Sequence, residues 1–182
     1  MRDFVVPHWS LIHTIVFDFD GVFTDNKIWI DQNGKESVRC DRRDGLAFDF
    51  LRRFSSINDW KIDYFVLSKE TNSVVEARCK KLNIRCLHGI SNKAEYLRGY
   101  LEVKGRGADG MIYIGNDLND LLAMQLSGCS LAPSDAHPVI LQQASMVLQQ
   151  KGGDGFLRAC IEMLLRIDMM GPDELDRLLR DL

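Results

Sequence analysis

Three short apolar runs, separated by longer segments with helical periodicity, constrain the fold of this chain more than any other feature. The runs cover residues 15–17, 64–67 and 111–114 and are rich in β-branched and aromatic side chains. Such runs are typical of strands that are buried on both faces of a parallel sheet. Helical patterns lie between and after them, near residues 45–54, 72–82, 93–103, 117–126 and 155–166. The alternation predicts an α/β fold of three layers, a Rossmann-like parallel sheet whose strands are connected by helices in right-handed crossovers.

One segment interrupts the alternation. Residues 27–40 contain the pair Asn33-Gly34, which favours a type I′ hairpin turn because both turn positions need a positive φ. The flanking strands would carry Ile28 and Ile30 on one face and Trp29 on the other. An isolated two-stranded hairpin is marginal in water, so we expect these faces to be covered. The same domain or another subunit would fit that expectation equally well.

The length of the chain fits one compact domain. Its 182 residues, of which 46% are hydrophobic, can bury a sizeable core without disulfide bonds. We expect a single domain over residues 1–170, with a hairpin flap over about 26–41 inserted after the first strand. The break at Gly171-Pro172 predicts that residues 171–182 form a short C-terminal helix or a tail.

The composition disfavours several classes of function. A net charge of −3 gives no general reason to expect the basic face that nucleic acids recruit. The five cysteines stand singly without a CxxC pair, which argues against a zinc ribbon and fits free thiols in a reducing compartment. The N-terminus lacks the apolar core of a signal peptide, and no apolar run approaches the ~18 residues of a membrane span. We therefore expect a cytoplasmic protein with no nucleic-acid or membrane partner.

Polar side chains follow the apolar runs at the point where each predicted strand ends. Asp18 follows the first run, Ser68 the second, and Asn116 and Asp117 the third. The carboxyl ends of parallel strands meet at one edge of an open sheet, where ligands bind. Each of these residues alone would more often serve in a turn or a helix cap. Their joint placement predicts a ligand site at this edge.

Asp18 and Asp20 indicate that this site holds a cation. Alternate residues of an extended segment project to the same side, so the two carboxylates can share a site. Two close carboxylates repel each other unless a cation lies between them, and Mg²⁺ prefers oxygen ligands. Gly21 then lets the chain turn away sharply. The alternative is an acidic surface turn, which the preceding apolar strand disfavours.

Three basic side chains are candidates for binding an anion. Lys93 begins a helix after a fourth expected strand, at residues 84–87, and would neutralise a phosphate group near the same edge. Arg78 and Lys81 are three positions apart, so they share one face of the helix over residues 72–82. The alternative for all three is a solvated side chain on the surface.

Together these motifs resemble those of the haloacid dehalogenase superfamily of phosphohydrolases. Residues 18–25 (DFDGVFTD) are similar to its first motif, Ser68 to its second, Lys93 to its third and residues 115–120 (GNDLND) to its fourth. The resemblance covers roughly residues 12–168, and the agreement of four motifs at the proper spacing is specific.

Further segments narrow the resemblance to the small capless branch that hydrolyses sugar-acid phosphates. They are the hairpin and the segments 43–45, 135–138 and 152–155 with Arg158. Residues 67–72 and 77–82 also resemble the phosphatase-like domain that follows bacterial N-acylneuraminate cytidylyltransferase domains. The implied substrate is a small phosphorylated sugar acid, either an N-acylneuraminate 9-phosphate or a 3-deoxy-ulosonate 8-phosphate.

The resemblance also implies a mechanism with a role for each motif. Asp18 would attack phosphorus to form an aspartyl-phosphate, and Asp20 would protonate the leaving oxygen and then activate water. Ser68 and Lys93 would hold the phosphoryl oxygens. Mg²⁺ would be the cofactor, with four candidate ligands: Asp18, Asp20, Asn116 and Asp117. Four residues would bind the substrate: Glu70, Arg78, Lys81 and Arg158. Relatives are homotetramers whose hairpins pack together, which would cover the apolar hairpin faces.

Four residues depart from the pattern of the family, and the mildest departure is Ser68 in place of the commoner threonine. Asn116 replaces an aspartate, which keeps an oxygen for the metal but removes one negative charge. Lys69 replaces a glycine, and Asp154 replaces an arginine. These departures keep a second function open, namely a weakly active or inactive phosphatase-like module that assembles or regulates a cytidylyltransferase of CMP-sialic acid synthesis. A third hypothesis, a phospho-acceptor receiver domain, is disfavoured because its acceptor lies on a middle strand rather than in a DxDG motif after the first.

Overall fold

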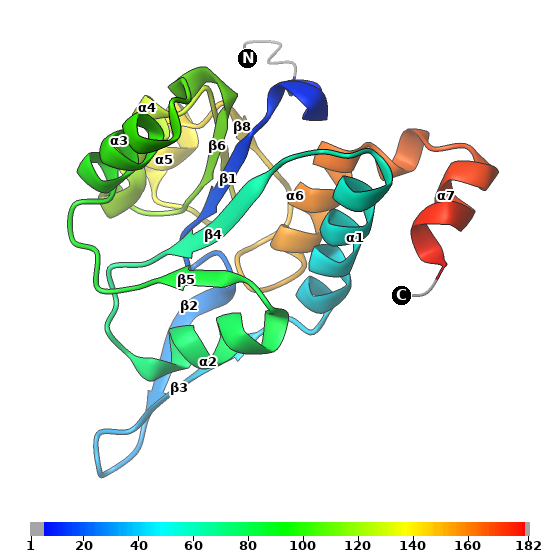
Figure 1. The fold of residues 1–182 in the computed structure, drawn as a ribbon. Helices are drawn as coiled ribbons and strands as arrows, with labels where there is room; N and C mark the ends of the chain where they lie inside the picture. Colours follow the sequence, from blue (N-terminus) through cyan, green and yellow to red (C-terminus); the bar gives the residue numbers. More distant parts are fainter. Residues whose placement is uncertain (1–5, 181–182) are drawn as a thin grey trace.

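The computed structural model describes residues 6–180, which form a six-stranded sheet between two layers of helices (Figure 1). The strand order is β5-β4-β1-β6-β7-β8, and each neighbouring pair is parallel. The strands are β1 (Thr14–Phe17), β4 (Asp63–Leu67), β5 (Arg85–Leu87), β6 (Met111–Ile114), β7 (Cys129–Ala132) and β8 (Met146–Val147). The three apolar runs are therefore the three neighbouring strands β4, β1 and β6, and the predicted α/β fold is confirmed.

The helices cover both faces of this sheet. On one face lie α1 (Arg43–Ile57), α2 (Ser73–Leu82), α6 (Phe156–Leu165) and α7 (Pro172–Leu179). On the other lie α3 (Lys93–Lys104), α4 (Leu121–Leu126) and α5 (Pro138–Gln143). Short 3₁₀ turns occur at η1 (Trp9–Leu11), η2 (Ala108–Gly110), η3 (Leu118–Asp120) and η4 (Ile167–Met169). Within the described residues, no helix has both the length and the apolar character that crossing a membrane requires.

The sheet divides the core into two apolar layers. Along β1, Ile15 and Phe17 pack into the layer beneath α1 and α6, whereas Val16 packs into the layer beneath α3 and α4. Side chains alternate across a strand, so a strand buried on both faces must be apolar at every position. The helix expected over residues 72–82 is also confirmed as α2, and it buries a one-sided stripe of Val75, Cys79 and Leu82.

The elements near the last strands are those that the sequence did not reveal. Strand β7, the two-residue strand β8 and helix α5 were not expected, and the expected helix over 117–126 begins as the turn η3 before α4. The segment after Gly171 forms helix α7, which packs against α1 through the buried side chain of Leu178. Residues 181 and 182 of the expected C-terminal segment lie outside the described part of the chain.

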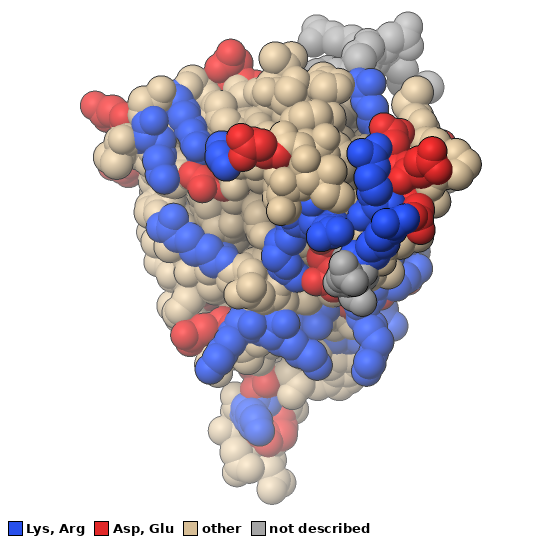
Figure 2. Space-filling view, turned by 45° about the vertical axis from the view of Figure 1, so that its right-hand side comes forward, with Lys and Arg blue, Asp and Glu red and all other residues tan. Residues whose placement is uncertain are grey.

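The hairpin consists of β2 (Thr24–Ile30) and β3 (Glu36–Cys40) and projects away from the sheet (Figures 1 and 2). The expected type I′ turn is wrong, because only Gly34 has a positive φ. The carboxylate of Asp31 accepts hydrogen bonds from the backbone N–H groups of Asn33 and Lys35, and this favours a longer loop.

The apolar side chains of the hairpin are only partly covered by the chain itself. Val38 packs against the core beneath α1 and α2. Ile28, Trp29 and Ile30 remain 50%, 57% and 61% exposed. Of the two expectations for the hairpin, packing on its own domain therefore accounts for β3 better than for β2.

Candidate active site

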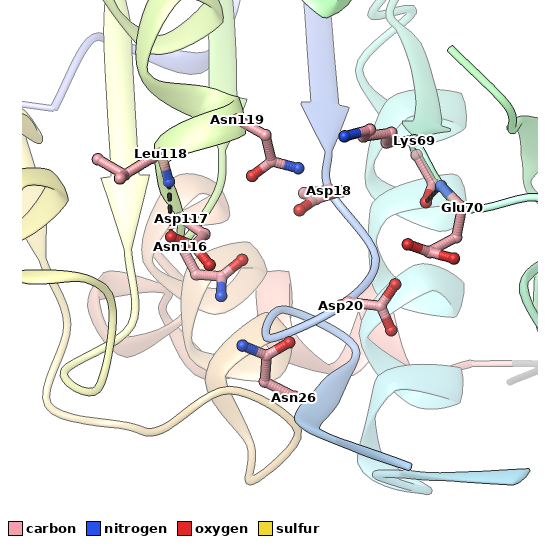
Figure 3. A pocket seen from close by; sticks show the side chains of 10 residues that line it. Asp18, Asp20, Asn26, Lys69, Glu70, Asn116, Asp117, Leu118 and Asn119 are labelled. Carbon is pink, nitrogen blue, oxygen red and sulfur yellow. Dashed lines mark hydrogen bonds between the residues drawn. The ribbon is translucent and has the colours of Figure 1, made fainter. Parts of the chain in front are cut away.

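A cavity of ≈ 330 Å³ opens at the carboxyl ends of β1, β4 and β6 (Figure 3). Parallel strands bring their carboxyl ends to one edge, so residues far apart in the sequence meet there. The lining residues are Asp18, Asp20, Asn26, Ser68, Lys69, Glu70, Asn116, Asp117, Leu118 and Asn119. The structure thus brings together the polar residues that follow the three predicted strands.

Asp18 lies at the floor of this cavity and is bound by Lys93. The Lys93 Nζ atom lies 2.6 Å from Asp18 Oδ1, and both side chains are almost fully buried. Burial raises the pKa of Asp18 well above its usual range, the charge of Asp120 adds to this rise, and Lys93 opposes it. Burial alone would lower the pKa of Lys93, but the two carboxylates raise it overall. Lys93 therefore stays charged and orients Asp18.

Asp120 connects Lys93 to the turn after β6. Its Oδ1 accepts hydrogen bonds from Lys93 Nζ and Tyr113 Oη, both at 2.7 Å. Its Oδ2 accepts from the backbone N–H groups of Asn116 and Asp117, at 2.9 and 3.2 Å. Asp120 is fully buried, so it positions other groups and does not reach the cavity. The sequence offered one signal for this residue, its place at the end of the fourth motif.

Asp20 lines the cavity beside Glu70. Burial raises the pKa of Asp20 to about 6, and the nearby charge of Glu70 contributes to the rise. Such a carboxyl group is partly protonated near neutral pH, which suits a group that must both give and take a proton. Ser68 is buried at the same edge, where its hydroxyl oxygen accepts a hydrogen bond from the Glu70 N–H. Its hydroxyl proton remains available to donate to a bound anion.

Asn116 offers an unused oxygen atom in the cavity. Its Oδ1 is buried and has no hydrogen-bond partner in the described part of the chain. Buried polar atoms are usually paired, so an orphaned amide oxygen in the same cavity as Asp18 fits the ligand set of a hard cation. No three His, Cys, Asp or Glu side chains of residues 6–180 form a metal cluster. A metal here would therefore rely on amide or backbone oxygens as well as carboxylates.

The side chain of Asp117, unlike the Oδ1 atom of Asn116, already has a hydrogen-bond partner among the described residues. Its side chain accepts a hydrogen bond from the N–H of Leu118 and caps the turn η3 together with Asp120. It still lines the cavity, so the capping role and a place at the rim are combined in one residue.

Three polar lining residues were not among the sequence candidates. Asn26 has a left-handed backbone, with φ of 60°, and its side chain points into the cavity (Figure 3). Lys69 and Asn119 approach from the ends of β4 and β6. The sequence marked Lys69 only as a departure from the family pattern and Asn119 only as part of the fourth motif, and it gave no signal for Asn26.

The structure does not bring three predicted substrate-binding residues into this cavity. Arg78 donates a hydrogen bond to the Asp41 carbonyl and pairs with the buried carboxylate of Asp44. Lys81 is exposed on α2. Arg158 stacks over the ring of Phe50, 4.7 Å from its centroid, and pairs with Glu162. A helix face is predictable from spacing, whereas the groups that it meets are set by the tertiary fold.

The remaining departure, Asp154, lies outside the cavity and pairs with Arg43 at 2.9 Å. Its loop packs tightly on the first motif, because a Cβ on Gly152 would stand 2.0 Å from the carbonyl oxygen of Gly21. The Gly153 N–H also donates a hydrogen bond to the Val22 carbonyl. The glycines of this loop therefore serve the close approach of two backbones.

A second cavity, of ≈ 390 Å³, adjoins the first beneath the hairpin. The two share Asp20, Asn26 and Glu70 as lining residues. The others in the second cavity are Phe19, Ile28, Glu36, Val38, Asn72, Val74 and Val75. Asn72 donates a hydrogen bond of 2.5 Å to Glu36, which ties the hairpin to the start of α2 and closes one side of this space.

The site at the end of β1 is typical of one class of hydrolases, which comparison with known families identifies. A buried aspartate there is bound by a lysine, and a second aspartate follows two residues further along the chain. The model of the haloacid dehalogenase-like hydrolases matches residues 55–159. The chain belongs to this family, and the resemblance inferred from its motifs is confirmed.

Similar proteins of known description agree with this assignment. The chain is 32% identical to the 3-deoxy-D-manno-octulosonate 8-phosphate phosphatase of Escherichia coli K12 over 162 residues, which are 88% of this chain and 83% of that protein. A Streptomyces avermitilis structure assigned to the HAD hydrolases is 36% identical, with a TM-score of 0.83 and coverage of 93% and 95%. The cobalt-bound deoxy-D-mannose-octulosonate 8-phosphate phosphatase of Haemophilus influenzae is 29% identical, with a TM-score of 0.74 and coverage of 87% and 90%.

Proposed function

We propose that this chain is a divalent-metal-dependent phosphatase that hydrolyses the phosphate ester of a small sugar acid. The observation that carries the proposal is the buried Asp18, which Lys93 holds at the floor of a cavity that also contains Asp20 and Ser68. The similarity to 3-deoxy-D-manno-octulosonate 8-phosphate phosphatases supports a 3-deoxy-ulosonate 8-phosphate as the substrate. An N-acylneuraminate 9-phosphate remains the other substrate inferred from the motifs.

In the first chemical step, a carboxylate oxygen of Asp18 attacks phosphorus and the bond from phosphorus to the sugar oxygen breaks. Asp20 donates a proton to that leaving oxygen, and its raised pKa enlarges the protonated fraction that this role needs. Ser68 donates a hydrogen bond to a phosphoryl oxygen, and Lys93 keeps Asp18 in place for attack.

In the second step, Asp20 takes a proton from a water molecule as that water attacks the phosphorus of the aspartyl-phosphate. The bond from phosphorus to Asp18 then breaks, which releases phosphate and restores the Asp18 carboxylate. The burial of Asp18 keeps bulk water away from the intermediate, so hydrolysis depends on the water that Asp20 orients.

Mg²⁺ is the proposed cofactor, with a carboxylate oxygen of Asp18, the backbone carbonyl oxygen of Asp20 and the orphaned Oδ1 of Asn116 as its ligands. Asp117 is a weaker candidate because its side chain already caps η3. When bound, the cation would neutralise the charge on the transferring phosphoryl group. The cobalt-bound relative supports a divalent ion in this family.

The other expectations drawn from the sequence stay predictions. They include a homotetramer covering the apolar hairpin, a single domain over residues 1–170 and contact of the substrate with Glu70, Arg78, Lys81 and Arg158. Glu70 lines both cavities, which supports its role. The alternative of an assembly module beside a cytidylyltransferase has less support, because the four proposed catalytic residues are intact: Asp18, Asp20, Ser68 and Lys93.

The test is phosphate release from 3-deoxy-D-manno-octulosonate 8-phosphate and N-acetylneuraminate 9-phosphate, each with Mg²⁺ and with EDTA. We expect release that requires the metal and that falls by roughly 10⁶-fold in Asp18→Asn, which is the scale of the loss in kcat when a nucleophile is removed. Asp59→Asn, which changes an exposed aspartate, is the matched control. Full turnover in Asp18→Asn, or no release from either ester by the folded wild type, would contradict the proposal.

A further inference from the structure

Lys69 is the one basic residue that lines either cavity among the described residues. The other charged lining residues are all acidic: Asp18, Asp20, Glu36, Glu70 and Asp117. Within these two cavities, a substrate that carries a second negative group beside its phosphate would therefore meet a single ammonium group from this chain. That makes the position of Lys69 decisive for the recognition of an acidic substrate.

The other cations near the site are already engaged. Lys93 is buried between Asp18 and Asp120, at 2.6 and 2.7 Å. Arg78 is held by the Asp41 carbonyl and by Asp44. Each of these groups would have to give up a buried partner to bind a substrate, which costs more than a new contact at the surface returns.

Lys69, in contrast, is free to bind a ligand. No carboxylate in residues 6–180 lies within ion-pair distance of its ammonium group, and the side chain is exposed. It directly follows Ser68, and Figure 3 shows it directed toward the centre of the cavity. Its ammonium is a compact charge on a flexible stem, so it can follow a ligand group at the mouth of the cavity.

The location of Lys69 also separates it from the reacting phosphoryl group. That group must lie on Asp18, which is 4% exposed at the floor, whereas Lys69 stands at the exposed rim. The part of the substrate beyond the scissile bond can extend either toward the rim at Lys69 or into the second cavity. The second cavity, walled by Phe19, Val38 and carboxylates, suits uncharged atoms and repels an anion.

Building on the proposed function, we infer that Lys69 is a specificity-determining residue that binds the carboxylate of the sugar acid. The uncharged carbon chain would then lie toward the second cavity. The glycine that stands here in the family pattern could not make this contact, so the lysine is a feature of this chain's own recognition.

Substrate comparison tests the inference. Wild type, Lys69→Met, Lys69→Arg and the surface control Lys80→Met are assayed with 3-deoxy-D-manno-octulosonate 8-phosphate, N-acetylneuraminate 9-phosphate and p-nitrophenyl phosphate, which lacks a carboxylate. In Lys69→Met we expect KM for the better sugar-acid ester to rise by about tenfold, the low end for a charged hydrogen bond. We expect kcat for that ester and kcat/KM for p-nitrophenyl phosphate to stay within twofold. Lys69→Arg should recover most of the affinity, and Lys80→Met should match wild type.

Binding of the phosphate-free sugar acid, measured by calorimetry, gives a readout that needs no turnover. The Kd should rise by a similar factor in Lys69→Met. An unchanged Kd and KM in Lys69→Met overturn the inference, and so does an equal loss of kcat/KM on all the esters, which would place Lys69 on the phosphoryl group. A wild type that hydrolyses none of the esters contradicts the proposed function instead, so the two failures are distinguishable.

Discussion

The main chain of Gly21 lies directly against the side-chain amide of Asn116, so that a Cβ on Gly21 would stand 2.0 Å from Asn116 Nδ2. Gly21 also has a φ of +78°, which residues other than glycine rarely adopt. The turn after the first motif and the proposed metal ligand are therefore packed as one unit. Anything that widens this contact should disturb both the fold and the site.

Gly21→Ala tests this contact, with Gly34→Ala as its control. Gly34 has nearly the same φ of +76°, but a Cβ there would meet nothing within 4 Å. We expect Gly34→Ala to cost about 1 kcal/mol from backbone strain alone. Gly21→Ala should cost about 3 kcal/mol because overpacking adds to the strain. Denaturant unfolding measures both changes, and equal losses would show that the contact with Asn116 carries no energy.

Asn116→Asp tests the ligand role of the fourth motif. The substitution keeps the shape of the side chain and adds a negative charge where the orphaned oxygen now lies. We expect the Mg²⁺ concentration for half-maximal activity to fall by about tenfold, since carboxylates are the stronger ligands of hard cations. Thermal unfolding with and without Mg²⁺ gives an independent readout, because ligand binding to the folded state raises Tm. The control is Asn119→Asp, which adds the same charge at the rim, and an equal gain there would argue for general electrostatics rather than ligation.

Asp44 provides a pH dependence of stability. Burial raises its pKa to about 7, although Arg78 opposes the rise. Its folded pKa lies above the unfolded value of 3.8, so its contribution to stability is full below about pH 4 and is lost as pH rises through about 7. Asp44→Asn should remove this loss, which amounts to at most roughly 4 kcal/mol. Unfolding free energies at pH 5 and pH 8 should therefore fall less with pH in the variant, and parallel pH profiles would refute the shift.

The exposed apolar side chains of the hairpin predict self-association. Ile28, Trp29 and Ile30 are each at least half exposed on a two-stranded element that is marginal alone. We expect wild type to have about four times the 20.8 kDa chain mass by light scattering. Trp29→Ser combined with Ile30→Ser should reduce the mass while the circular dichroism spectrum stays unchanged. Leu11→Ser, which alters another exposed apolar side chain, is the control. A monomeric wild type would refute the tetramer directly.

The sequence predicted the centre of the fold better than its edge. Strands buried on both faces must be continuously apolar, and this requirement made β1, β4 and β6 readable. Strand β7 carries the buried Ser130, whose hydroxyl bonds with the partly buried Ser145, so a polar pair interrupts the pattern. Strand β8 has two residues and is too short for any periodicity to appear. Local pattern thus fails where tertiary contacts satisfy polar groups.

The residues of the site divide in the same way, into those that local pattern predicts and those whose partners are set by the tertiary fold. The positions of Asp18, Ser68 and Asn116 were predictable because each directly follows a strand, and strand ends converge by topology. The engagement of Arg78 by Asp44 joins residues 34 positions apart, and helical spacing carries no information on such a partner. Asp120 is a similar case, since its partner Lys93 lies 27 positions away.

Asp120→Asn shows what that long-range contact is worth. Both carboxylate oxygens of Asp120 accept from donors: Lys93 and Tyr113 on one side, and the N–H groups of Asn116 and Asp117 on the other. An amide would have to point its NH₂ group at one of these donor pairs, which leaves buried donors unsatisfied. We expect the unfolding free energy to fall by about 2–3 kcal/mol and kcat to fall at least tenfold, because Lys93 loses one of its two anchors. In Asp59→Asn, whose partner Lys61 is exposed, both quantities should stay unchanged. If Asp120→Asn kept the stability of wild type but lost turnover, Asp120 would act on the reaction itself rather than by holding Lys93 and the turn after β6.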